Sequence, residues 1–320
     1  MPFDNKIPIE RIATPTPYQI GDIYSYLVLD EPITLIDVGV ATEETREVWR
    51  QRLKELKLTV KDIKRIVLTH GHSDHYGLAR EFAEASGAPI LLHKADWEKV
   101  KNRRRFYQRM LPYVSLYGVP EEYLAIFDRV LEWEEGFCLD IPEEMLKPLE
   151  DGDTLEFEHI TFTVHHVPGH STGHVILMHR DWALSGDFIF DSFTPIPVIE
   201  MDERGNRLKT GLMYRDSLIR MKEAGLKRYY PSHRETEGDY LKALSNMKER
   251  MRYKEEFILG TLRRKGRCTP YEIIKELYPE HKPQEIYIVA SDTLGRLDLL
   301  EEKGLVSWEE RDGLVYYYLC

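Results

Sequence analysis

Histidine and aspartate crowd into the run THGHSDH at residues 69–75, directly after an apolar stretch. Three imidazoles and a carboxylate in so short a segment would be costly to bury without a cation to hold. His70 and His72 alternate, so both point the same way on an extended segment. Asp74 and His75 follow in the next turn and can reach a second position in space. The spacing therefore predicts a site for a pair of metal ions.

Three later motifs supply further candidate ligands, each where a strand-like run gives way to a loop. They are His170 in PGHSTGH (168–174), Asp187 in LSGDFIF (184–190) and His233 in YYPSHRE (229–235). Catalytic groups usually lie on loops that a rigid scaffold holds in place. We therefore expect these side chains to converge on one edge of a sheet sandwich.

Together with LIDVG at 35–39, these motifs resemble those of the metallo-β-lactamase superfamily over about residues 7–250. The resemblance implies the following ligands: His70, His72 and His170 for one metal, Asp74, His75 and His233 for the other, and Asp187 as the bridge. It also implies that Asp37 supports the ligand loop without binding a metal, and we expect a supporting or structural role for His174. The implied activity is hydrolysis by a metal-bridging hydroxide that Asp74 orients. Zinc suits these ligands, and iron or manganese are alternatives.

Apolar periodicity predicts the elements that carry these motifs. The expected strands are 23–30, 33–37, 64–69, 89–93, 153–166, 174–179 and 182–190, and the expected helices are 43–57, 75–86, 210–224 and 238–254. With the resemblance, this order predicts an α+β fold, a four-layer αββα metallo-β-lactamase sandwich, over residues 1–254.

Residues 94–147 form a long, mostly helical insertion in this domain. Its opening stretch, 94–111, has seven basic residues against two acidic ones, with aromatic residues between them. One interpretation is a solvated helix face backed by apolar residues. The other is a cap over the metals that captures an anionic substrate, because arginine suits phosphate and carboxylate groups. Its candidate substrate-binding residues are Arg103, Arg104, Arg105 and Tyr107.

Residues 255–320 resemble a small winged-helix domain. The expected helices are 257–265, 269–277 and 284–303, followed by strands 305–308 and 314–319. The third helix has two basic residues against five acidic ones, so DNA groove binding is not expected. A packing, dimerising or substrate-lid role is expected instead. With this tail the chain is similar to the beta-lactamase-like protein 2 group, and its site motifs also resemble glyoxalase II.

Composition limits the partners of the chain. A net charge of −11 over 320 residues argues against broad affinity for nucleic acids or anionic membranes. The opening residues show no secretory signal, and no apolar run approaches the ~18 residues that span a bilayer. A cytoplasmic location is therefore expected. The expected partner is a small anionic substrate, with no membrane, with nucleic acid only as a substrate, and with a homodimer left open.

The leading hypothesis is a binuclear metal-dependent hydrolase of a small anionic ester or thioester, for which coenzyme A-like thioesters fit a basic cap. The alternative is a metal-dependent phosphodiesterase or single-strand ribonuclease, in which the same cap follows phosphates. A long basic channel would favour RNA, and one closed pocket would favour a thioester. A mononuclear iron dioxygenase and a non-catalytic binding protein are lesser hypotheses.

Overall fold

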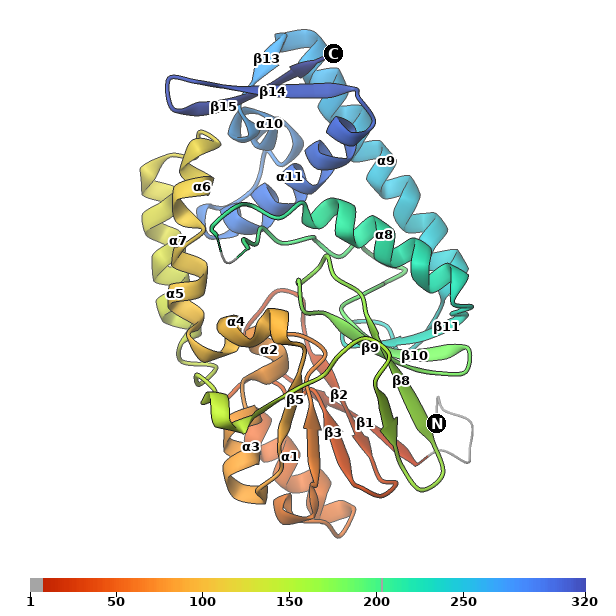
Figure 1. Cartoon of the computed structure of the whole chain (residues 1–320). Helices are drawn as coiled ribbons and strands as arrows, with labels where there is room; N and C mark the ends of the chain where they lie inside the picture. The colour runs from red at the N-terminus through yellow and green to blue at the C-terminus, as the bar shows by residue number, and fades with distance from the viewer. Residues whose placement is uncertain (1–7, 203) are drawn as a thin grey trace.

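The computed structural model describes residues 8–202 and 204–320 and contains two six-stranded sheets packed face to face (Figure 1). Residues 1–7 and 203, which the predicted domain 1–254 includes, lie outside the described residues. The first sheet runs in chain order through β1 (Ile9–Thr14), β2 (Ile23–Val28), β3 (Thr34–Ile36), β4 (Arg65–Val67), β5 (Ile90–Leu92) and β6 (Leu146–Pro148). From β3 to β6 neighbouring strands are parallel, so their carboxyl ends share one edge.

The second sheet has the strand order β12-β11-β10-β9-β8-β7. Its strands are β7 (Thr154–Glu156), β8 (Thr161–His166), β9 (Val175–His179), β10 (Trp182–Gly186), β11 (Arg228–Pro231) and β12 (Gly238–Asp239). The neighbours β10 and β11 are parallel, and the other pairs are antiparallel. Parallel pairing brings the loops after β10 and β11 to the same end of the sheet.

Helices cover the outer face of each sheet. On the first sheet, α1 (Glu43–Glu55) and α3 (Ala79–Ser86) contribute Trp49 and Phe82 to a core with the strand residues. On the second, α8 (Thr210–Glu223) and α9 (Tyr240–Lys265) contribute Tyr214 and Met247. A separate apolar core, which includes Phe162, fills the space between the sheets. The predicted αββα sandwich is confirmed.

Local sequence explains why α1 forms where it does. The Thr42 side chain accepts a hydrogen bond from the Thr45 backbone N–H and caps the first turn. Glutamates in the first turn and basic residues in the last turn complement the helix dipole. The face that carries Trp49 and Leu53 is buried against the sheet, and the opposite face is charged.

The insertion is mostly helical, as predicted. It contains α4 (Trp97–Lys101), α5 (Arg103–Gln108), α6 (Leu111–Leu116) and α7 (Glu121–Glu134). The C-terminal region contains α10 (Pro270–Leu277) and α11 (Ile286–Glu302), with a three-stranded sheet of β13 (Arg267–Cys268), β14 (Val306–Arg311) and β15 (Leu314–Leu319). Short 3-10 turns lie at Val60–Asp62, Lys94–Asp96, Glu143–Met145 and Pro283–Glu285. Each helix in the described part of the chain is too short or too polar to cross a membrane.

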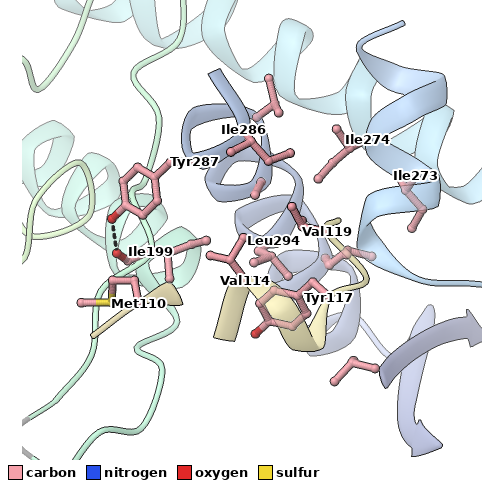
Figure 2. Packing of buried hydrophobic residues seen from close by; sticks show 14 of the residues in the cluster. Met110, Val114, Tyr117, Val119, Ile199, Ile273, Ile274, Ile286, Tyr287 and Leu294 are labelled. Atoms are coloured by element: carbon pink, nitrogen blue, oxygen red, sulfur yellow. Dashed lines mark hydrogen bonds between the residues drawn. The ribbon is translucent and has the colours of Figure 1, made fainter. Parts of the chain in front are cut away.

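The insertion and the C-terminal region share one apolar core (Figure 2). Val114 of α6 packs in it with Ile274 of α10 and Leu294 of α11. The Tyr287 hydroxyl donates a hydrogen bond to the Ile199 carbonyl at 2.5 Å. Fourteen of the seventeen residues of α11 are buried, so this helix has little surface to offer a DNA groove. The winged-helix interpretation itself stays a prediction.

Several element boundaries differ from the sequence predictions. The expected helices 238–254 and 257–265 are one continuous helix, α9, because no glycine or proline interrupts the chain at the predicted domain boundary. The expected strand 153–166 is the hairpin of β7 and β8. The helix expected over 75–86 is divided into α2 (Ser73–Tyr76) and α3 near Gly77, where a Cβ would lie 2.5 Å from the Phe137 carbonyl oxygen.

A glycine contact joins the C-terminal region to the sandwich. A Cβ on Gly211 of α8 would lie 2.4 Å from the Gly295 carbonyl oxygen of α11. We predict that Gly211→Ala lowers the free energy of unfolding by about 1–3 kcal/mol, because the two backbones must separate. Urea denaturation measures the change.

Gly295→Ala is the matched control. Its Cβ would meet the Pro197 side chain at 3.3 Å and the Gly211 Cα only at 3.7 Å. Alanine also has a helix propensity about 1 kcal/mol better than glycine, which offsets the tighter contact. Equal destabilisation by the two substitutions would contradict this account of the α8–α11 contact.

Candidate metal centre

Three imidazoles lie close together, two in the segment after β4 and one in the loop between β8 and β9. His70, His72 and His170 have nitrogens that all lie within 4.8 Å of one another, and we call them the first cluster. The His70 Nε2 lies 2.9 Å from the His72 Nδ1. The outer nitrogens have other partners: His70 Nδ1 lies 3.0 Å from Thr69 Oγ1, and His170 Nδ1 lies 3.0 Å from the Ile196 carbonyl oxygen. The remaining nitrogens therefore face the centre.

A second cluster lies beside it, formed by Asp74, His75 and His233, whose candidate ligand atoms are again within 4.8 Å of one another. The His75 Nδ1 is 2.8 Å from Asp37 Oδ2, and the His233 Nδ1 is 2.9 Å from the Asp22 carbonyl oxygen. These contacts turn both Nε2 atoms inward. The His233 Nε2 lies 3.3 Å from Asp74 Oδ2.

Asp187, at the end of β10, stands between the two clusters. Its Oδ2 is 3.5 Å from the His170 Nε2 of the first cluster. Its Oδ1 is 3.5 Å from the His75 Nε2 and 3.6 Å from the His233 Nε2 of the second. The Asp187 backbone N–H donates to His174 Nε2 at 3.1 Å, so His174 lies behind the centre and holds this loop. The carboxylate therefore lies within 3.5–3.6 Å of imidazoles from both clusters.

Four inward-facing atoms are buried without a hydrogen-bond partner in the described part of the chain: His75 Nε2, His170 Nε2, His233 Nε2 and Asp187 Oδ1. A buried polar atom without a partner costs about 1–3 kcal/mol, so four in one place require an explanation. Divalent cations would satisfy all four. Imidazole nitrogens and carboxylate oxygens are ligands that zinc accepts.

The electrostatics also suit cation binding. Burial, with the neighbouring His75, lowers the pKa of His70 well below its usual range, so this imidazole is neutral and its nitrogen is free to bind a metal. Burial opposes ionisation of Asp187, but His233 and His75 outweigh it and hold the pKa of the carboxyl well below its usual value. Burial opposes protonation of His75, but Asp37, Asp187 and Asp74 outweigh it and raise the pKa of this imidazole well above its usual value. The centre therefore combines a neutral His70 with an ionised Asp187 whose negative charge favours a cation.

Asp37 organises the first motif from the end of β3. Its Oδ1 accepts a hydrogen bond from the Thr69 backbone N–H at 2.8 Å, and its Oδ2 accepts from the Thr69 hydroxyl at 2.8 Å. The Val175 N–H of the second sheet donates to the Thr69 carbonyl at 2.9 Å. Thr69 thus connects Asp37, the ligand loop and the second sheet.

Most of the candidate substrate-binding residues of the insertion contact other residues of the insertion. Arg103 is buried, pairs with Glu134 and lies 4.5 Å from the ring of Tyr107, which is also buried. Arg104 lies 3.1 Å from a carboxylate oxygen of Asp128. Arg105 is exposed. Much of the positive charge of this stretch is therefore neutralised within the insertion, and the substrate-binding role of these residues stays a prediction.

Sequence reasoning missed Arg234, which directly follows the ligand His233. It is exposed, and its guanidinium carbon lies 5.3 Å from the centre of the Phe193 ring. Phe193 stacks on Phe190 at 4.1 Å, and the Phe190 ring lies 6.4 Å from the His233 ring. Within residues 8–202 and 204–320, Arg234 forms no ion pair with a carboxylate. Its position after a candidate ligand is the signal that could have identified it.

We predict that Asp37→Asn weakens divalent metal binding by about 10–100-fold, because it alters the hydrogen bond that orients His75. Equilibrium dialysis with zinc, followed by elemental analysis, measures the change. Asp216→Asn is the control, since this carboxylate is exposed and, among residues 8–202 and 204–320, pairs with the neighbouring Arg215 alone. Unchanged zinc affinity in Asp37→Asn would show that Asp37 does not support the centre.

Comparison with known proteins agrees with this geometry. The family model of the metallo-beta-lactamase superfamily matches residues 19–250. The probable metallo-hydrolase YqjP of Bacillus subtilis is 26% identical over 96% of each chain, and the hydroxyacylglutathione hydrolase GloC of Haemophilus influenzae is 26% identical over 44% of this chain and 55% of its own length. The crystal structure of the metallo-beta-lactamase family protein TTHA1429 from Thermus thermophilus has a TM-score of 0.83 and 25% identity, and covers 98% of this chain and 99% of its own. The chain belongs to the metallo-beta-lactamase superfamily.

Proposed function

We propose that the chain is a binuclear metal-dependent hydrolase of a small ester or thioester that carries an anionic group. The observation that carries this proposal is the set of buried, inward-facing atoms of His75, His170, His233 and Asp187, which have no hydrogen-bond partner in the described part of the chain. Zinc is the proposed metal. The hydroxyacylglutathione hydrolase among the relatives, although similar over less than half of this chain, supports thioester chemistry.

The first cluster would hold one ion, the second cluster the other, and Asp187 both. When bound, two such ions supply a water of lowered pKa and polarise the group under attack. Asp74 would orient the attacking water, a role supported by its side chain being 14% exposed while His75 and His233 are fully buried. Asp37 and the Asp22 carbonyl hold the second cluster's imidazoles in the orientation that the chemistry requires.

Arg234 is the residue we propose for the anionic end of the substrate. It lacks a carboxylate partner among the described residues and follows His233 directly, whereas Arg103 and Arg104 already have acidic partners. A guanidinium binds carboxylate or phosphate through two parallel hydrogen bonds. An anionic group bound to Arg234 would place the ester or thioester of the same substrate next to the second cluster.

The phosphodiesterase or single-strand ribonuclease stays as the alternative hypothesis. It needs a basic surface that follows several phosphates. The ion pairs of Arg103 with Glu134 and of Arg104 with Asp128 reduce the positive charge of the insertion, which favours a single anionic group over a polyanion.

The main test is thiol release from a panel of acyl-coenzyme A and glutathione thioesters. We predict turnover by the zinc-loaded chain, and a loss of at least about 100-fold with Asp187→Ala, because the bridging carboxylate is removed. Asp216→Ala, on the exposed face of α8, should match the wild type. No release by zinc-loaded wild type would reject the thioester proposal, and single-stranded RNA would be the next substrate.

We predict that Arg234→Ala raises KM for an anionic thioester roughly tenfold and leaves kcat near the wild-type value, since a charge-assisted hydrogen bond contributes about 1.5–3 kcal/mol. Steady-state kinetics measures both constants. Arg180→Ala is the matched control: Arg180 is also exposed and also has a left-handed backbone, with φ of 54° against 58° for Arg234, but it lies in the β9–β10 turn. Equal KM values for Arg234→Ala and wild type would exclude Arg234 as the handle.

A further inference from the structure

A buried ionic network lies where the helical insertion begins. Lys99 of α4 has a fully buried ammonium group, and its Nζ lies 2.9 Å from Asp96 Oδ1, 2.6 Å from Glu200 Oε1 and 2.5 Å from Ser171 Oγ. The Asp96 and Glu200 side chains are 0% and 1% exposed. The metal chemistry described above uses none of these groups.

Asp96 connects both loops of the first cluster. Its Oδ2 accepts a hydrogen bond from the backbone N–H of Gly71, the residue between His70 and His72, at 2.6 Å. Its Oδ1 accepts from the backbone N–H of Gly173 at 2.9 Å, three residues after His170. A Cβ on Gly173 would lie 2.6 Å from the Asp96 carboxyl carbon, so the loop fits closely around this group.

Ser171 and Thr172 complete the contact with the second loop. The Ser171 hydroxyl lies 2.5 Å from Asp96 Oδ2 and 2.7 Å from Oδ1. Glu200 accepts hydrogen bonds from the Thr172 hydroxyl and, at 3.3 Å, from the Thr172 backbone N–H. Each of the three residues that follow His170 is therefore held by the network.

Burying the charged groups of Asp96, Lys99 and Glu200 costs free energy, which argues for a role beyond packing. Two carboxylates face one ammonium group in a site that excludes water, and apolar residues of similar volume often stabilise a fold as well or better. Burial, together with Asp96, raises the pKa of Glu200 against the opposing effect of Lys99. The carboxylates of the network accept hydrogen bonds from the backbone N–H groups of Gly71, Thr172 and Gly173. Buried polar networks whose groups are satisfied make the segments that they contact rigid.

Ser171 with Lys99 is not a nucleophile and base for this enzyme. Both side chains are fully buried, so no substrate carbonyl can reach the Ser171 hydroxyl. That hydroxyl also already contacts Asp96. The pair acts on the backbone of the loop and not on a substrate.

We propose that Asp96, Lys99 and Glu200 are positioning residues that set the distance between the His70–His72 loop and the His170 loop, and thereby the affinity of the first cluster for its metal. The inference rests on the proposed binuclear site. It also assigns a role to the start of the insertion, since Asp96 and Lys99 bring that segment onto the ligand loops. The imidazoles of the second cluster have different partners, namely Asp37 and the Asp22 carbonyl.

The test is a cobalt(II) titration of the metal-free full-length chain, followed through the visible spectrum of the bound ion. His170→Ala and His233→Ala provide the reference spectra for a lost first and a lost second site. We expect Asp96→Asn to weaken the first site about 10–100-fold and to leave the second site within about threefold of wild type. Lys101→Met is the matched control for Lys99→Met, because Lys101 makes its two ion pairs on the surface of the same helix.

Each outcome decides a separate point. Two unchanged sites in Asp96→Asn, or an equal loss at both, would overturn the positioning role. A wild-type chain that binds no cobalt would instead reject the binuclear site of the proposed function. If Asp96→Asn fails to fold, Glu200→Gln decides the question in the same way, since it keeps the shape of the side chain and removes its charge. A spectrum of Lys99→Met identical to that of Lys101→Met would also contradict the inference.

Discussion

The carboxylate of Asp187 is shared by both histidine clusters, and the rest of the site is arranged around it. Its two oxygens face different imidazoles at 3.5–3.6 Å, across the junction of the two sheets. Burying so many polar groups is costly unless each has a hydrogen-bond partner in the scaffold on one side and a cation on the other. The scaffold supplies the hydrogen bonds through five groups: Asp37, the Asp22 and Ile196 carbonyls, His174 and Asp96. Cations supply the rest in our account.

The insertion and the C-terminal region form one body on this sandwich. Their shared core includes residues of α6, α10 and α11 (Figure 2). The contact of Gly211 with Gly295 joins that body to α8. A separate winged-helix domain over residues 255–320 stays a prediction. In the structure, α9 passes without a break through the predicted boundary at residue 254, and α11 is largely buried. The C-terminal region therefore supports the insertion, which in turn reaches the ligand loops through Asp96.

Most strands and helices and the first motif could be predicted because their signals are local. The convergence of His170, Asp187 and His233 on that motif was expected from their places at strand ends and from the resemblance to the metallo-β-lactamase superfamily. His70, His72, Asp74 and His75 lie within six residues, and alternating strands flank them. The environment of these residues could not be predicted, because it depends on contacts between distant parts of the chain. Asp96 meets Gly173 and Lys99 meets Glu200 across 77 and 101 residues. For the same reason the sequence showed the charge of Arg103 but not its partner Glu134, 31 residues away.

Anomalous diffraction at the zinc absorption edge, from crystals of the full chain grown with zinc, tests the central claim most directly. We predict two strong peaks, one among His70, His72 and His170 and one among Asp74, His75 and His233, with Asp187 between them. Binuclear sites of this kind place their ions about 3.5–4 Å apart. A single peak, or peaks only at other positions, would contradict a binuclear centre and with it the proposed hydrolase.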